Sequence, residues 1–202
     1  MFPFKPQRRA LLTATAALAM LTLAGCDSKA KKLAVKGGSD ITGTHLGSDL
    51  SMVDQDGHPR TLADYKGKIV VVFFGYTHCP DVCPTAMAQL AQTMTLLKGE
   101  ASQTQVLMIT IDPQRDTPQI MGRYVKAFNP NFVGLTGTPK QVAETAKSFK
   151  AYYAKEPGPT KDSYVMNHSS SFYILDKTGD ARILLPGNAL AEVIAHDIQL
   201  LV

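Results

Sequence analysis

Apolar residues along this chain fall into short unbroken runs that alternate with stretches of helical spacing. The runs Ile69 to Phe74 and Val106 to Ile111 are typical of strands buried on both faces of a sheet. Apolar positions spaced as on one helix face follow Pro84, Pro118 and Pro139. Proline suits the first turn of a helix, so each of the three marks an expected helix start. The pattern therefore predicts strands alternating with helices.

Weaker signals add elements at both ends of this alternation. A turn at Asp56–Gly57 after an apolar stretch predicts an N-terminal hairpin, and a turn at 177–179 predicts a second hairpin. Together these features predict an α/β fold with a central mixed sheet flanked by helices and an added N-terminal hairpin. The remaining expected elements are strands at 50–54, 132–135, 171–175 and 182–185 and a last helix from Asn188.

The N-terminus carries an export pattern. Three basic residues precede position 10, and the run Ala10–Ala24 contains no charge. This run is shorter than the roughly 20 residues of a membrane-spanning helix. It ends in the small residues of Leu23–Gly25, directly before Cys26. We therefore expect residues 1–25 to be a signal peptide that is absent from the mature protein.

The small residues before Cys26 also resemble the bacterial lipobox, in which the cysteine becomes the lipidated first residue. The alternative is a plain secreted protein. Asp27 resembles the signal that keeps lipoproteins in the inner membrane, so the expected location is the periplasmic face of that membrane, with a lipid anchor at Cys26. Residues 26–44 lack sustained periodicity and are expected to form the anchor and a flexible linker. The folded domain is expected over residues 45–202.

Charge gives no argument for a nucleic-acid partner. The first 25 residues hold 3 of the 21 basic residues and no acidic residue, so the mature chain has 18 basic and 17 acidic residues, a net charge of +1. The basic isoelectric point of the full chain therefore comes largely from the expected signal peptide. We expect no nucleic-acid binding.

Two thiols remain for chemistry once Cys26 is assigned to the anchor. Cys79 and Cys83 follow the strand Ile69–Phe74, and Cys83 is expected to cap the helix that Pro84 begins. In an oxidising compartment such a pair forms a structural disulfide, a redox couple or a metal site. A disulfide over so short a loop would contribute only about 2 kcal/mol, and two thiolates suit copper(I) or zinc. Spacing alone does not separate the redox couple from the metal site.

A third ligand would decide between these uses. His168 lies in a polar stretch before the strand 171–175, and it belongs at the same sheet edge as the cysteine loop if the two strands are neighbours. A histidine at this position could equally be an ordinary capping or turn residue that binds no metal. His78 adjoins Cys79, and its side chain is expected to point away from the thiols. The other three histidines are expected at the surface: His45, His58 and His196.

Three segments together resemble the Sco/SenC family: 73–84 with its CPDVCP loop, 112–118, and the loop around His168. The similarity runs from about Gly47 to the C-terminus. The resemblance implies a thioredoxin-like fold and one bound copper, Cu(I) or Cu(II), held by Cys79, Cys83 and His168. It also implies delivery of copper to the dinuclear centre of cytochrome c oxidase. The expected partners are the oxidase subunit that carries this centre and an upstream periplasmic copper donor.

The resemblance leaves other functions open. Cys79 and Cys83 could instead be the catalytic redox pair of a thiol–disulfide reductase that keeps the acceptor's cysteines reduced, although the spacing is CxxxC rather than CxxC. The same site could also serve a redox or copper sensor. Asp112 flanks the site in the family and is a candidate for a role behind the ligands or in partner recognition. Asp116 or Thr117 is expected to cap the helix at Pro118.

Overall fold

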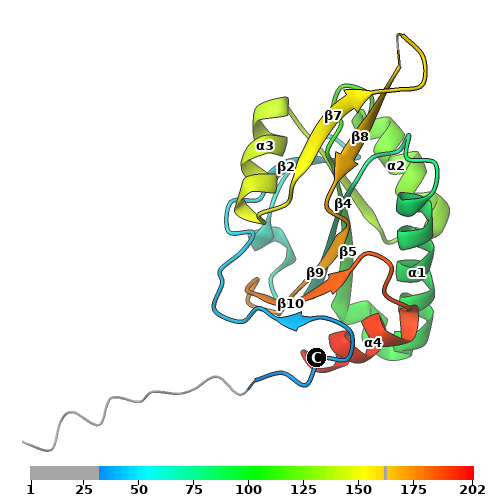
Figure 1. Cartoon of the computed structure of the whole chain (residues 1–202). Coiled ribbons are helices and arrows are strands. Elements are labelled where there is room, and N and C mark those ends of the chain that lie inside the picture. Colours follow the sequence, from blue (N-terminus) through cyan, green and yellow to red (C-terminus); the bar gives the residue numbers. More distant parts are fainter. Residues whose placement is uncertain (1–31, 162) are drawn as a thin grey trace, which may run out of the picture. The chain divides into compact units, whose positions relative to one another are not determined.

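The computed structural model describes residues 32–161 and 163–202 (Figure 1). The signal peptide expected over residues 1–25, the lipidation expected at Cys26 and the signal at Asp27 lie outside these residues. No helix within the described ranges combines the length and apolar character that crossing a membrane requires.

A mixed sheet forms the centre of the described domain. Its strand order is β1-β10-β9-β4-β5-β6-β2-β3. The neighbours β4, β5 and β6 are parallel, whereas β9 pairs antiparallel to β4 and β2 pairs antiparallel to β6. The strands are β1 (Ser39–Asp40), β2 (Ser51–Asp54), β3 (Pro59–Thr61), β4 (Ile69–Gly75), β5 (Thr104–Thr110), β6 (Val133–Thr136), β9 (Ser171–Leu175) and β10 (Ala181–Pro186).

Helices cover both faces of this sheet, with α3 on one side and α1, α2 and α4 on the other (Figure 1). Thr117 and Thr138 cap α2 and α3, each accepting a hydrogen bond from a backbone N–H of the first turn, and proline follows each cap. The helices are α1 (Val82–Leu97), α2 (Pro118–Phe128), α3 (Pro139–Ser148) and α4 (Ala191–Gln199), with short 3-10 turns η1 (Leu62–Tyr65) and η2 (Lys98–Gln103).

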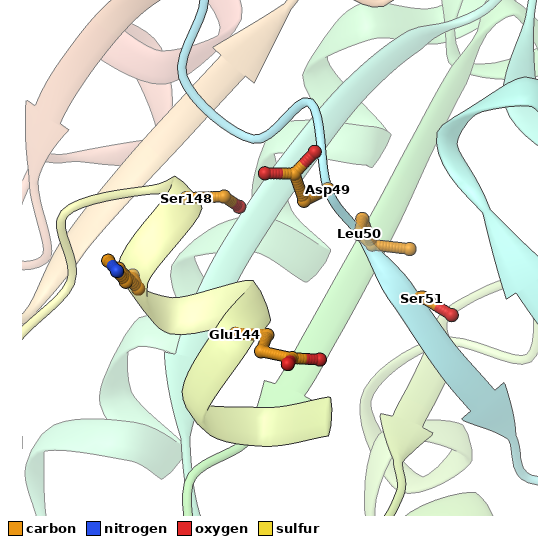
Figure 2. A pocket seen from close by; sticks show the side chains of 6 residues that line it. Asp49, Leu50, Ser51, Glu144 and Ser148 are labelled. Carbon is orange, nitrogen blue, oxygen red and sulfur yellow. The ribbon is translucent and has the colours of Figure 1, made fainter. Parts of the chain in front are cut away.

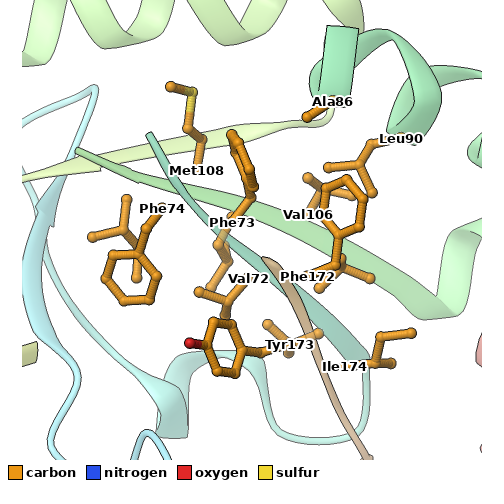
Figure 3. Close-up of a cluster of buried hydrophobic side chains, with 14 of the residues drawn as sticks. Val72, Phe73, Phe74, Ala86, Leu90, Val106, Met108, Phe172, Tyr173 and Ile174 are labelled. Carbon is orange, nitrogen blue, oxygen red and sulfur yellow. The ribbon is translucent and has the colours of Figure 1, made fainter. Parts of the chain in front are cut away.

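The strand β4 organises the core because all of its residues are buried. Successive side chains point to opposite faces of a strand. Phe73 accordingly packs on Phe172, with ring centroids 5.5 Å apart, and Phe74 packs on Phe149 and Tyr173 on the other face. Figure 3 shows Phe73 and Phe172 on the side of α1 and Phe74 on the side away from it. The end of β4 is therefore held by packing on both faces.

The expected N-terminal hairpin is confirmed as β2 and β3. Asp54, at the end of β2, accepts hydrogen bonds from the backbone N–H groups of Asp56 and His58 and from the Arg60 side chain. These bonds fix the turn that the aspartate–glycine pair predicts. The expected central strands, the helices at Pro118 and Pro139 and the hairpin β9–β10 are likewise present.

Three expected boundaries are wrong. The folded part begins before residue 45, because β1 pairs with β10 and the Lys36 N–H donates to the buried carboxylate of Asp197. The helix α1 begins at Val82 with Asp81 as its N-cap, so Cys83 lies inside the first turn rather than at the cap. Pro84 fits there because first-turn N–H groups lack helical partners. The helix α4 begins at Ala191 rather than at residue 188, after a turn closed by Ala189 N–H and Pro186 O.

A two-stranded hairpin near the site was not predicted from the sequence. The strands β7 (Tyr153–Pro157) and β8 (Tyr164–His168) form a separate two-stranded antiparallel sheet. Figure 1 shows this hairpin at the end of the described domain where α1 begins. Its sequence is polar, and its strands pair with each other rather than with the central sheet, so it lacks a continuous apolar pattern. His168 is its last residue.

Candidate metal centre

The cysteine loop leaves the carboxyl end of β4, as expected for a site in an α/β sheet. Gly75 ends β4, and a Cβ at this position would lie 2.9 Å from Cys83 Sγ and 2.9 Å from the Phe73 ring. No side chain fits so close an approach, so glycine allows Cys83 to sit against the strand. Cys79 is partly exposed, whereas Cys83 is fully buried.

Both cysteines are free thiols in this structure. The backbone N–H of Cys83 donates to Cys79 Sγ over 3.4 Å, so the Cys79 sulfur lies at the N-terminus of α1. Burial raises the pKa of the Cys83 thiol far above its ordinary value, and the neighbouring Cys79 adds to this. Cys83 is therefore protonated at neutral pH in the metal-free protein. A metal ion that binds there must displace this proton.

The structure brings His168 to the buried cysteine. His168 Nε2 lies 3.8 Å from Cys83 Sγ. Bonds of about 2.3 Å to sulfur and about 2.0 Å to nitrogen place two ligands of one trigonal or tetrahedral metal roughly 3.5–3.7 Å apart. The observed separation is close to this range. The strands β4 and β9 are neighbours, so the condition for placing His168 at the same sheet edge as the cysteine loop is met.

The protonation of the imidazole also suits a ligand. His168 Nδ1 lies 3.0 Å from the backbone oxygen of Ser169, which can only accept, so Nδ1 carries the hydrogen. Nε2 then has its lone pair free toward Cys83. Burial lowers the pKa of His168 and favours the neutral form. The ring makes edge contacts with Phe73 and Tyr76, with centroids 6.4 Å and 6.1 Å away.

The three expected ligands are not yet arranged around a common point. Among residues 32–161 and 163–202, no group of three or more His, Cys, Asp or Glu side chains is placed to hold a metal ion. Cys83 and His168 face each other, and the Cys79 sulfur instead accepts the helix N–H. A three-ligand site requires Cys79 to turn toward the other two. The full ligand set thus remains a prediction.

Asp112 contacts the hairpin rather than the thiols. Its side chain is 3% exposed and accepts hydrogen bonds from Arg115 Nε and, over 2.9 Å, from the Tyr164 hydroxyl. Arg115 also donates to the Tyr164 backbone oxygen over 3.2 Å, and its guanidinium stacks on the Tyr164 ring at 3.7 Å. Tyr164 is the first residue of β8, the strand that ends at His168. Asp112 therefore holds the strand that carries the histidine.

Asp116 has a structural role at the site that the sequence did not indicate. This fully buried carboxylate accepts from the Thr77 N–H over 3.1 Å, from the Thr77 hydroxyl over 2.6 Å and from the Thr110 hydroxyl over 2.6 Å. It ties the cysteine loop to the end of β5. The capping role expected for Asp116 or Thr117 belongs to Thr117, which accepts from Ile120 N–H. The only hint in the sequence is an aspartate shortly after a buried strand.

Each of the remaining histidines has a ring nitrogen near a carboxylate. His45, His58 and His196 lie 3.6 Å, 3.7 Å and 2.9 Å from carboxylates of Asp180, Asp54 and Asp197, respectively. His78 is half exposed, and its Nδ1 lies 3.9 Å from Asp116. His168 is thus the histidine that contacts a cysteine within the part of the chain that the structure describes.

Two surface hollows of the described domain are lined by residues other than Cys79, Cys83 and His168. A hollow of about 630 Å³ lies beside β2 and α3, and no predicted site residue lines it (Figure 2). A smaller pocket of about 150 Å³ lies beside the hairpin and includes Asp112, Lys155 and Met166. The residues around the larger hollow are Asp49, Leu50, Ser51, Glu144, Lys147 and Ser148.

Comparison with known proteins connects this geometry to one family. A protein-family model described as SCO1/SenC matches residues 39–202. The mitochondrial SCO2 homologue of Bos taurus is 40% identical over 133 residues, which cover 65% of this chain and 50% of that protein. A SCO2-like protein of Rickettsia felis is 36% identical over 135 residues, 66% of each chain. The chain thus spans about half the length of the first mammalian relatives.

Solved structures show the same fold. Bradyrhizobium japonicum ScoI with copper bound has a TM-score of 0.71 and 33% identity, covering 78% of this chain and 99% of that one. Yeast Sco1 with copper bound has a TM-score of 0.70 and 30% identity, covering 76% and 86% of the two chains. These neighbours confirm the expected thioredoxin-like fold. They also establish that similar proteins bind copper.

Proposed function

The chain belongs to the SCO1/SenC family, and from this premise we propose that it is a copper chaperone for the assembly of cytochrome c oxidase. It would bind one copper ion through Cys79, Cys83 and His168 and deliver it to the dinuclear copper centre of the oxidase. The partner would be the subunit that carries this centre, and a periplasmic copper donor would act upstream. The copper-bound structures of two similar proteins support the choice of metal.

One observation carries the proposal most directly. Cys83 Sγ and His168 Nε2 face each other across 3.8 Å, although the two residues lie 85 positions apart in the chain. The neutral imidazole with its lone pair toward the sulfur is the form that binds a metal. A fold that needed only a buried thiol would not require this pairing.

The ligand types suit a metal that must be both held and released. Two thiolates bind copper(I), and an imidazole also tolerates copper(II). The thiolates lie on the loop and first turn after β4, whereas the imidazole lies on the separate β7–β8 sheet. Loss of the His168 contact would leave copper on two sulfur ligands and weaken the site for transfer.

Asp112 would act through His168 rather than as a ligand. Its bonds to Tyr164 and Arg115 fix the first residue of β8. Outer partners that orient a ligand typically change metal affinity by roughly 10–100-fold when removed. We therefore propose that Asp112 positions β8, the strand that ends at His168.

The decisive test is copper binding by the reduced full-length chain under anaerobic conditions. We expect one copper per chain and a thiolate-to-copper(II) charge-transfer band after copper(II) is added. The Cys79→Ser, Cys83→Ser and His168→Ala variants should each lose stoichiometric binding, because each removes a ligand. A chain that takes up no copper after reduction would refute the proposal, and uptake of zinc alone would do the same.

A thiol–disulfide reductase remains the second candidate, with one observation in its favour. Cys79 Sγ accepts the Cys83 N–H at the start of α1, a position where thiols become reactive. A reductase would keep its activity in the His168→Ala variant, whereas a chaperone would lose copper binding. A sensor would bind copper as the chaperone does but would not load the oxidase subunit. Transfer from the loaded chain to that subunit separates these cases.

The location follows from the sequence pattern at the N-terminus. Residues 1–25 would be removed, Cys26 would carry the lipid, and the domain would face the periplasm from the inner membrane. A similar protein of Bacillus anthracis, 29% identical, is described as a SCO1/SenC family lipoprotein, which supports this assignment. Mass spectrometry of the mature N-terminus tests it, and an unmodified Cys26 would contradict it.

A further inference from the structure

His78 is the exposed neighbour of the cysteine pair, and its ring is held in a defined orientation. The side chain is 51% exposed and directly precedes Cys79. Its Nδ1 lies 3.2 Å from the Thr77 hydroxyl oxygen. That hydroxyl donates in turn to Asp116 Oδ1 over 2.6 Å. Asp116 is fully buried, so the relay connects a surface imidazole to a fixed carboxylate.

These two hydrogen bonds determine which ring nitrogen of His78 carries the hydrogen. A threonine hydroxyl has a single hydrogen, and that of Thr77 is used in the bond to Asp116. Toward His78 the Thr77 oxygen can therefore only accept, so His78 Nδ1 must be the donor. His78 Nε2 then keeps its lone pair.

Metal-binding histidines typically show this arrangement. One ring N–H donates to a protein oxygen, and the other nitrogen faces the metal. His168 has the same arrangement, with Nδ1 bonded to the Ser169 oxygen and Nε2 beside Cys83. The two histidines thus share one tautomer, His168 half-buried beside Cys83 and His78 exposed and next to Cys79 in the chain.

Exposure sets the order in which an incoming ion meets these groups. Cys83 is fully buried and His168 is half-buried, whereas Cys79 is partly exposed and His78 is exposed. A copper ion that arrives at the surface therefore reaches His78 and Cys79 before it reaches the inner pair. One thiolate and one imidazole form a ligand pair that copper(I) accepts.

We infer that His78 and Cys79 form a transient outer site through which copper enters and leaves the inner site. This inference rests on the proposed copper function. On entry, bonds from copper to His78 Nε2 and Cys79 Sγ form as the donor's ligands leave, and the Cys79 thiol proton passes to solvent. The bond to His78 breaks as copper gains Cys83 Sγ and His168 Nε2, whereas the bond to Cys79 is kept. Copper keeps its oxidation state throughout, and the Cys83 thiol proton also passes to solvent.

The test separates the rate of copper transfer from the final affinity. The full-length chain, solubilised in detergent and reduced, is mixed anaerobically with the copper(I) complex of bicinchoninate, and loss of the coloured complex is followed by stopped flow. The His78→Asn variant retains an amide N–H toward Thr77 but lacks Nε2. The matched control is His58→Asn, because His58 is also exposed and also lies beside a buried aspartate, Asp54.

We expect His78→Asn to take up copper at least about tenfold more slowly than the wild type, with unchanged final occupancy, charge-transfer spectrum and unfolding midpoint. The control should load at the wild-type rate. Thr77→Val, which removes the acceptor but keeps the imidazole, should be slowed less than His78→Asn.

Equal uptake rates for the wild type and His78→Asn would overturn the inference while leaving the proposed function intact. A loss of final affinity as large as that of His168→Ala would also overturn it, because His78 would then be a permanent ligand. Failure of the wild type itself to take up copper would refute the proposed function, and the inference would fall with it.

Discussion

The two halves of the candidate site are built differently. Cys83 lies in the first turn of α1, packed against the end of the buried strand β4, whose position is fixed by packing on both faces of the sheet. His168 ends a two-stranded hairpin outside that sheet. Polar contacts hold it in place, among them those from Tyr164 to Asp112 and from Arg115 to β8. The thiol half therefore depends on core packing, whereas the imidazole half depends on these hydrogen bonds together with the packing of Met166 and of the rings beside His168.

Removal of the buried thiol should have the largest effect of the changes considered, and it acts on the half of the site that the core holds. Cys83→Ser should lower copper affinity by more than the roughly 100-fold that loss of an outer partner causes, because a ligand itself is lost. Isothermal titration with copper on the reduced chain measures it. Thr93→Ser is the control, since it alters another buried residue of α1 and keeps the hydroxyl. A near-normal affinity in Cys83→Ser would mean that the core half does not bind the metal.

Overpacking of the core half should reduce stability. In Gly75→Ala the added methyl would lie 2.9 Å from Cys83 Sγ, so the strand or the helix start must shift. We expect a loss of about 1–3 kcal/mol in the free energy of unfolding, measured by urea denaturation, together with weaker copper binding. Gly99→Ala is the control, because no atom lies within 4 Å of its added carbon. Wild-type stability in Gly75→Ala would contradict the tight packing described.

Loosening of the hairpin should lower copper affinity more than it lowers the free energy of unfolding. Tyr164→Phe removes the hydroxyl that donates to Asp112 and keeps the ring between its cationic neighbours. We expect roughly tenfold weaker copper affinity and a loss of about 1 kcal/mol in stability. Tyr152→Phe is the control, because Tyr152 is 59% exposed. Equal affinities of the two variants would show that the Asp112 contact does not position His168.

The smallest expected effect is on the pH dependence of stability of the metal-free chain. Burial lowers the pKa of His168 below its ordinary value of 6.5, so the unfolded state binds more protons there. The contribution of the neutral His168 side chain to the free energy of unfolding is complete above pH 6.5 and is lost as the pH falls below 6.5. His168→Gln should therefore flatten the decline in stability over that interval, as measured by urea denaturation at a series of pH values. Tyr152→Phe should keep the wild-type slope, and an unchanged slope in His168→Gln would refute the expectation.

The same difference explains what the sequence predicts and what it does not. The strand β4 is apolar throughout, and α2 and α3 begin with threonine followed by proline. Each of these elements can therefore be predicted from its own few residues. The hairpin carries exposed residues such as Lys155 and Glu156, and its pairing depends on a partner strand with equally weak signals. Its existence therefore follows from the tertiary structure.

The contacts that orient the site are also non-local. Asp116 accepts from Thr77, 39 residues earlier, and Asp112 accepts from Tyr164, 52 residues later. Local sequence cannot reveal either pair. Cys79 and Cys83 were identifiable from their shared loop, whereas the approach of His168 to Cys83 required the fold. The expectation that His78 points away from the thiols did not include its hydrogen bond to Thr77, which in turn donates to Asp116.

The separation of β7 and β8 from the central sheet has a consequence for how such a protein can diverge. Substitutions and length changes at the tip of the hairpin disturb no strand pairing of the central sheet. Lineages are thus free to vary the surface beside the histidine while the buried sulfur environment stays constant. For an engineer, the hairpin is accordingly a segment that can be exchanged between relatives without altering any strand pairing of the central sheet.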